Sequence, residues 1–123
     1  MVVDDELALR ALVARGFRER GYEVLEVSDA VMALDVARVA SPPIDLVVTN
    51  SLTGHPTGVE LITRLRENNP TLPVIHLLGS HHPEERWYDD TPPEGIPTLF
   101  KPFNLWDLID EAEKTLATKE SHV

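Results

Sequence analysis

The chain contains 123 residues, no cysteine, and 21 Asp and Glu against 11 Lys and Arg, for a formal net charge of -10. Its length suits one domain with a single core, and the lack of cysteine excludes disulfides and thiolate metal sites. No apolar run approaches the ~20 residues of a membrane span, and the negative charge opposes binding to nucleic acid or anionic lipid. We therefore expect one cytoplasmic domain that binds neither nucleic acid nor membrane.

Helical and apolar segments alternate in the first half of the chain. Apolar residues with helical spacing predict a helix over about residues 6–20, namely Leu9, Leu12, Val13, Gly16 and Phe17. A short β-prone segment follows at 22–27, and a second helix is indicated by Ala30, Ala33, Leu34 and Ala37. The prolines at 42 and 43 end that helix. Residues 44–49 are almost all apolar, which is typical of a parallel strand buried on both faces.

The same alternation continues in the second half. A buried strand is predicted at 73–78, after a third helix carried by Val59, Leu61, Ile62 and Leu65. Between residues 79 and 101 the pattern weakens, and a helix that starts near Pro83 should be short or distorted because Pro92 and Pro93 stop it. A last strand at 96–100 leads to Asn104, the expected N-cap of a final helix. The buried stripe of that helix comprises Leu105, Leu108, Ile109, Ala112 and Leu116.

Five strands that alternate with helical segments predict an α/β fold. We expect a flavodoxin-like, doubly wound, five-stranded parallel sheet with strand order 2-1-3-4-5 and helices on both faces. In such sheets the functional residues gather at the carboxyl ends of the strands, where the strand order reverses. The polar residues at the predicted strand ends are Asp4, Asp5, Asn50 and Lys101.

These residues and their spacing resemble the receiver domain of two-component response regulators, in particular the chemotaxis-regulator type. The resemblance is carried by Val2-Val3-Asp4-Asp5-Glu6, the strand that ends at Asn50, the spacing of eight residues from Asn50 to Gly58, and Phe100-Lys101-Pro102-Phe103. It implies a receiver domain over residues 1–118, followed by a C-terminal tail at 119–123. It also implies that the family's phosphorylated aspartate stands where this chain has Asn50.

The resemblance further assigns a role to each residue of the pocket. Asp5 would bind Mg²⁺ directly and Asp4 mainly through water, residue 50 and the backbone carbonyl of Leu52 would be further ligands, and Lys101 would contact the phosphoryl group. A neutral carboxamide at Asn50 is a poor nucleophile, so we expect no aspartyl phosphorylation. Mg²⁺ prefers anionic oxygen ligands, and one carboxylate fewer should leave its binding weak and no cofactor required.

Two further departures concern the residues that respond to phosphorylation in the family. A Thr or Ser is usual at the end of the fourth strand, and an aromatic residue is usual three positions before the lysine. Leu78 and Thr98 occupy these switch positions here. Leu78 cannot donate a hydrogen bond, and Thr98 is not aromatic. Ser80 supplies the hydroxyl instead if the alignment shifts by two residues, an alternative that the sequence leaves open.

The leading hypothesis is a receiver-type signalling module without enzymatic activity, which acts through protein contact independently of phosphorylation. Its expected partner is a histidine kinase or a downstream regulator, and it is expected to be a monomer or weak homodimer. One alternative is a conventional Mg²⁺-dependent receiver in which Asn50 is engineered or deamidates to aspartate. Another is the receiver fragment of a hybrid sensor histidine kinase. A flavodoxin-like cofactor binder is disfavoured because the strand-end loops lack a phosphate cradle rich in Gly, Ser and Thr.

The resemblance also predicts local geometry. The Lys101-Pro102 peptide bond should be cis, which would aim the lysine at the acid pair, within ion-pair reach of Asp4, Asp5 or both. The usual partner face of the family is formed by the fourth helix, the fifth strand and the fifth helix. In this chain that face would be framed by Trp87, Tyr88 and Trp106.

Overall fold

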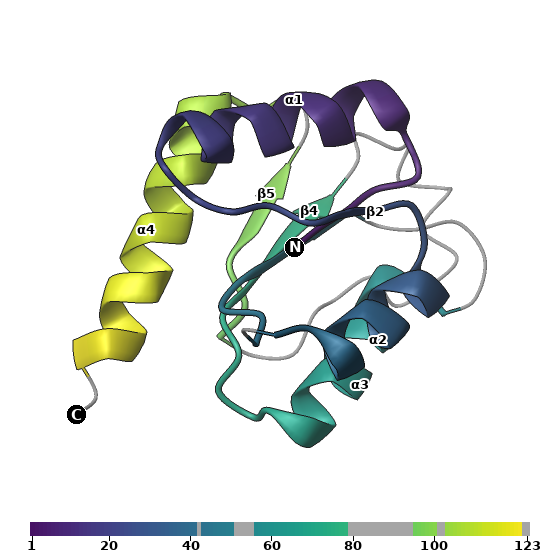
Figure 1. Ribbon diagram of the computed structural model, residues 1–123. Coiled ribbons are helices and arrows are strands. Elements are labelled where there is room, and N and C mark those ends of the chain that lie inside the picture. The colour runs from purple at the N-terminus through teal and green to yellow at the C-terminus, as the bar shows by residue number, and fades with distance from the viewer. Residues whose placement is uncertain (42, 51–55, 79–94, 101–102, 122–123) are drawn as a thin grey trace.

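The computed structural model of the protein describes residues 1–41, 43–50, 56–78, 95–100 and 103–121 (Figure 1). The helices are α1 (Leu7–Glu19), α2 (Ala30–Val39), α3 (Gly58–Asn68) and α4 (Leu105–Ser121), and the strands are β1 (Val2–Val3), β2 (Glu26–Val27), β3 (Val47–Asn50), β4 (Val74–Leu78) and β5 (Thr98–Phe100). The strands pair in parallel in the order β2-β1-β3-β4-β5. The predicted flavodoxin-like α/β fold and its strand order are thereby confirmed.

Two helical layers enclose the sheet, with α1 and α4 on one face and α2 and α3 on the other (Figure 1). Alternate strand residues point to opposite faces and so divide the core into two clusters. The cluster under α1 and α4 includes Val2, Val13, Phe17, Val48, Ile75, Leu77, Leu108, Ile109 and Ala112. The cluster under α2 and α3 includes Val3, Val27, Ala30, Ala33, Val47, Leu61, Ile62, Leu65 and Val74. Burial on both faces explains why the strands read as continuous apolar runs.

Side-chain caps set the starts of three helices. Asp29 accepts a hydrogen bond from the backbone three residues ahead at 2.7 Å, and Asn104 accepts one from the Trp106 amide at 2.8 Å, as predicted for an N-cap. Thr57 and Glu60 form a reciprocal capping box with two hydrogen bonds of 3.2 Å. This box fixes the first turn of α3 beside the end of β3. None of the helices in the described part of the chain is long and apolar enough to cross a membrane.

Two predicted strands begin several residues later than expected, and the last strand, predicted over 96–100, begins at Thr98. Strands were predicted over 22–27 and 44–49, but pairing begins only at Glu26 in β2 and at Val47 in β3. In the described sheet β2 lies beside β1, which pairs with it through Val2 and Val3, so β2 is limited to two residues. β3 also lies beside β4, and that pairing begins at Val47 and Val74. Residues before Glu26 therefore lie outside the strand pairs of the sheet.

One side chain also differs from the sequence prediction. Leu12 was placed on the buried stripe of α1 but is 52% exposed, whereas Val13 and Phe17 are buried as predicted and Ala14 joins them. Successive helix residues are rotated by about 100°, so Leu12 lies beside the buried stripe rather than on it. At the other end of the chain, α4 continues to Ser121. The predicted division into a receiver domain over 1–118 and a tail over 119–123 stays a prediction.

Candidate functional site

Asp4 and Asn50 meet at the carboxyl ends of β1 and β3. Asp4 directly follows β1 and is 2% exposed, and Asn50 is the last residue of β3 and is 7% exposed. The Nδ2 amide of Asn50 donates a hydrogen bond to Oδ1 of Asp4 over 3.2 Å. The structure therefore brings together two of the predicted site residues, and the neutral side chain serves as a donor to the acidic one.

The carboxylate of Asp4 is also held by the start of α1. Its Oδ1 accepts a second hydrogen bond from the backbone amide of Glu6 at 2.8 Å, and its backbone carbonyl accepts one from Arg10 at 3.1 Å. Arg10 in turn lies 3.5 Å from the carboxylate of Glu26. Asp5 is exposed beside this network. The sequence analysis did not select Arg10, although its position in the first turn of α1 allows it to reach back to Asp4.

The start of α3 lies very close to the end of β3 at this site. A Cβ atom at Gly58 would lie 2.6 Å from the backbone oxygen of Asn50 and 3.4 Å from Nε2 of His76. The hydroxyl of Thr49 also donates to the Asn50 carbonyl, at 3.1 Å. His76 is fully buried in β4, so its predicted place in a strand is confirmed. The spacing of Gly58 from Asn50 had been noted only as a family resemblance, and the structure supplies its physical reason.

We expect Gly58→Ala to lower the free energy of unfolding by about 1–3 kcal/mol, because the new methyl group would force a backbone oxygen of Asn50 to move. Urea denaturation measures this loss. The matched control is Gly16→Ala, where the added Cβ would meet only side-chain methyls of Leu105 and Ile109, at 2.9 and 3.0 Å. These methyls can shift, and alanine also favours the helix, so the control should lose less. Equal losses in the two variants would contradict the proposed role of Gly58.

The two substituted switch positions lie at different points along the strand direction. Leu78 is the last residue of β4 and pairs with Phe100, whereas Thr98 is the first residue of β5 and pairs with His76. Thr98 is half-buried. These backbone positions agree with the alignment used above, and their role in a response to phosphate stays a prediction.

Several predicted features lie outside the described residues. These are the carbonyl of Leu52, the Ser80 alternative, the short fourth helix after Pro83, and Lys101 with its cis bond to Pro102 and its ion pair with the acids. Within the part of the chain that is described, no three histidine, cysteine or carboxylate side chains are grouped to hold a metal ion. The buried part of the pocket offers such an ion one carboxylate, that of Asp4, which already accepts two hydrogen bonds.

Comparison with known proteins gives a consistent family assignment. The sequence profile of the response regulator receiver domain matches residues 1–113. The chain is 30% identical over 109 residues to the probable transcriptional regulatory protein TcrX of Mycobacterium tuberculosis, covering 89% of this chain and 45% of TcrX. It is 27% identical over 120 residues to the response regulator receiver protein CpdR of Brucella abortus, covering 94% of each. The chain thus spans less than half of TcrX and nearly all of CpdR.

Solved structures agree with the sequence relatives. A response regulator receiver protein from Sinorhizobium medicae superposes with a TM-score of 0.80 at 28% identity, over 94% of this chain and 91% of that protein. The receiver domain of NtrX from Brucella abortus gives a TM-score of 0.76 at 28% identity, over 95% of this chain and 97% of that domain. Both resemble this chain over nearly their whole length.

Proposed function

Because the chain belongs to the response regulator receiver family, we propose that it is a two-component signalling module that works through protein contact without accepting a phosphoryl group. The observation that carries this proposal is the contact between Asn50 and Asp4. Asn50 occupies the place of the acceptor aspartate, and its Nδ2 donates to the neighbouring carboxylate at 3.2 Å. An amide in this place has no anionic oxygen with which to attack phosphorus.

The same contact supports a site that needs no bound cation. Two carboxylates at this distance would repel each other and would require a positive ion between them. An amide and a carboxylate instead attract each other, so the buried pair is stable as it stands. We therefore propose that the chain requires no cofactor and has no enzymatic activity. Mg²⁺ would bind weakly, through Asp5, the oxygen of Asn50 and the Leu52 carbonyl, with Lys101 completing the charge balance.

A signalling partner would find apolar surface on β5 and α4. Phe100 is 57% exposed and Trp106 is 47% exposed. The guanidinium of Arg20 lies 5.3 Å from the Trp106 ring centroid and also pairs with Glu113 at 2.6 Å, which holds the indole at the edge of the core. Aromatic side chains are enriched in protein interaction sites. We propose a histidine kinase or a downstream regulator as partner of a cytoplasmic monomer or weak homodimer.

The proposal is tested by incubating the unmodified protein with a small phosphodonor and Mg²⁺ and measuring its intact mass. We expect no phosphoryl adduct, and we expect unchanged amide chemical shifts around Asn50. A conventional receiver from the family serves as the positive control for the donor. A phosphoryl adduct on protein whose Asn50 is shown by peptide mapping to be undeamidated would overturn the proposal. An adduct confined to deamidated molecules would instead favour the conventional receiver as the functional form.

A further inference from the structure

Arg10 joins the first turn of α1 to the carboxyl end of β1 and to β2. Its Nη1 donates a hydrogen bond to the backbone carbonyl of Asp4 at 3.1 Å, and its Nε lies 3.5 Å from Oε1 of Glu26. The side chain of Arg10 is 16% exposed, and its Nε is buried. Water therefore screens the charge of this guanidinium poorly. The acid pocket thus has a fixed and largely buried cation at its border.

The charge of Arg10 is close to the buried carboxylate of Asp4. Nη1 of Arg10 is bonded to the carbonyl oxygen of that residue, and the carboxylate carbon of an aspartate is three covalent bonds from its own carbonyl carbon. These lengths place the guanidinium within roughly 7 Å of the carboxylate. A positive charge at this distance attracts the carboxylate and repels any cation that the carboxylate would bind.

The ion pairs around Glu26 do not cancel the charge of Arg10. Oε1 of Glu26 lies 3.5 Å from Arg10, and its Oε2 lies 3.0 Å from Arg18. Two arginines and one glutamate carry a net charge of +1, which matches the single negative charge of Asp4. Arg18 is half exposed and also donates to the carbonyl of Val24, before β2, at 3.0 Å. Arg10 is therefore the member of this group that acts on Asp4.

Arg10 also helps to fix the backbone of Asp4. The amide of Asp4 donates to the carbonyl of Val27 at 3.1 Å, and its carbonyl accepts the bond from Arg10. Its Oδ1 accepts bonds from the Glu6 amide and from Nδ2 of Asn50, at 2.8 and 3.2 Å. To bind an ion through Oδ1, the carboxylate would have to give up or stretch these bonds. Arg10 therefore favours the orientation that receives Asn50.

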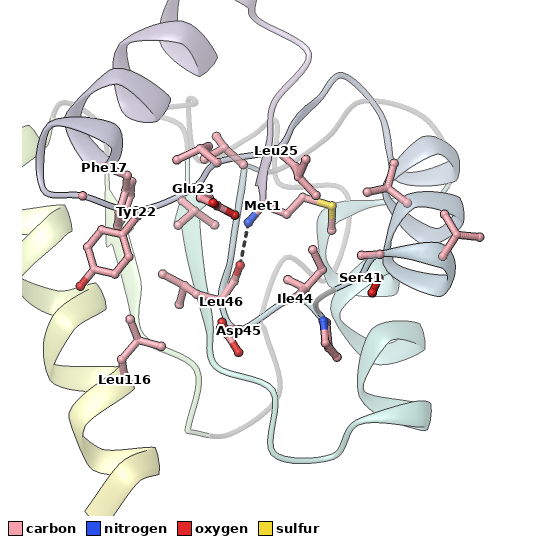
Figure 2. A pocket seen from close by; sticks show the side chains of 18 residues that line it. Met1, Phe17, Tyr22, Glu23, Leu25, Ser41, Ile44, Asp45, Leu46 and Leu116 are labelled. Carbon is pink, nitrogen blue, oxygen red and sulfur yellow. Dashed lines mark hydrogen bonds between the residues drawn. The ribbon is translucent and has the colours of Figure 1, made fainter.

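The charged groups at the amino end of β1 do not supply positive charge to this pocket. Figure 2 shows them around the amino group of Met1, which donates to the carbonyl of Leu46 at 2.8 Å, with the carboxylate of Glu23 beside it. Burial lowers the pKa of this amine to about 6, so it is largely neutral at pH 7. Asp4 is also three strand residues away from Met1, a distance of roughly 10 Å.

We propose that Arg10 is a built-in cation of the acid pocket and lowers the affinity of the pocket for divalent cations. Its positive charge balances Asp4, and its hydrogen bond holds the backbone of Asp4 in place for Asn50. This inference rests on the proposed function, in which no bound cation is required, and adds a second cause to it. Asn50 removes one anionic ligand, and Arg10 repels a cation from the ligands that are left.

The test is a titration with Mg²⁺ alone, followed by the amide chemical shifts around Asp4. The unmodified protein is compared with Arg10→Gln, which removes the charge but keeps a side-chain donor, and with Arg10→Lys, which keeps the charge. The matched control is Arg18→Gln, because it removes the same charge from the same partner, Glu26, on a half-exposed side chain. Lys101 lies outside the described residues and is the same in every protein.

We expect Arg10→Gln to bind Mg²⁺ about tenfold more tightly than the unmodified protein, because one positive charge near the carboxylate is gone. Arg10→Lys and Arg18→Gln should each stay within about threefold of the unmodified protein. The amide spectrum shows whether each variant is folded. Arg10→Met is a second neutral variant that should show the same gain, and it replaces Arg10→Gln if that protein does not fold.

Unchanged or weaker Mg²⁺ binding in Arg10→Gln would overturn the inference, since Arg10 would then have only a structural role. Equal gains in Arg10→Gln and Arg10→Lys, or in Arg10→Gln and Arg18→Gln, would also overturn it. A conventional receiver of the family is titrated alongside. If the unmodified protein bound Mg²⁺ as tightly as that receiver, the proposed function would fail together with this inference. Weak binding in both the unmodified and the Arg10→Gln proteins would overturn this inference alone.

Discussion

Replacing Asn50 with aspartate should lower the free energy of unfolding by roughly 2–4 kcal/mol in the absence of divalent cations, and Mg²⁺ should restore most of it. In the variant, a second carboxylate would stand at the place from which Nδ2 now donates to Asp4 at 3.2 Å. Both side chains are buried, so water screens their repulsion poorly. Urea denaturation with and without Mg²⁺ measures the effect.

The matched control for this variant exchanges the two residues, as Asp4→Asn together with Asn50→Asp. It restores one amide and one carboxylate to the buried pair, so its stability should recover without Mg²⁺. If Asn50→Asp alone were as stable as the unmodified protein and insensitive to Mg²⁺, the hydrogen bond from Asn50 to Asp4 would not stabilise the fold as proposed.

The Asn50→Asp variant should also accept one phosphoryl group from a small phosphodonor with Mg²⁺, since it regains the anionic nucleophile beside Asp4 and Asp5. Intact mass detects the adduct. The conformational response should stay small because Leu78 offers no hydroxyl to the phosphoryl group and Thr98 has no aromatic ring that could move in response. Amide chemical-shift changes that extend over the surface of β5 and α4 would show that these two positions are not limiting.

The stability of the protein should rise between about pH 6 and pH 8 through the amino group of Met1. Its pKa is about 6 in the fold, against an ordinary value of 8.0, because burial disfavours the ammonium. Below pH 6 the amine is charged in both folded and unfolded states and the full burial cost applies. Above pH 8 it is neutral in both and the cost is gone. The difference between the two pKa values corresponds to a rise of about 3 kcal/mol in the free energy of unfolding.

Urea denaturation at a series of pH values measures this rise, and intact mass checks that Met1 is retained. The control is the same protein with its amino terminus acetylated, which carries no charge at any pH. The contribution of the amine is the difference between the two proteins, because every other titrating group is common to both. Parallel stability curves for the free and acetylated forms would contradict the lowered pKa of Met1.

The local pattern of apolar and polar residues was enough to predict the architecture of this protein. Alternating apolar strands and amphipathic helices, ended by prolines such as Pro43 and Pro70, have only a few arrangements that bury both faces of a sheet. The same logic placed Asp4 and Asn50 at neighbouring strand ends, where the structure has them in contact. The sequence also showed that residue 50 is a neutral amide rather than a carboxylate, because this depends only on the identity of one side chain.

Most of the features that escaped prediction depend on distances between segments far apart in the sequence. The donor role of Asn50 toward Asp4 and the contact of Gly58 with the backbone of Asn50 arise only when β1, β3 and α3 are packed. Leu12 is as apolar as its buried neighbours, and only the rotation of α1 on the sheet leaves it exposed. Residues 22–25 and 44–46 have the composition of strands, yet they lie before the first residue pairs of β2 and β3, and Leu25 and Leu46 only accept single bonds from β1 and Met1. A strand forms only where a neighbour supplies hydrogen bonds, and the short β1 decides where that neighbour ends.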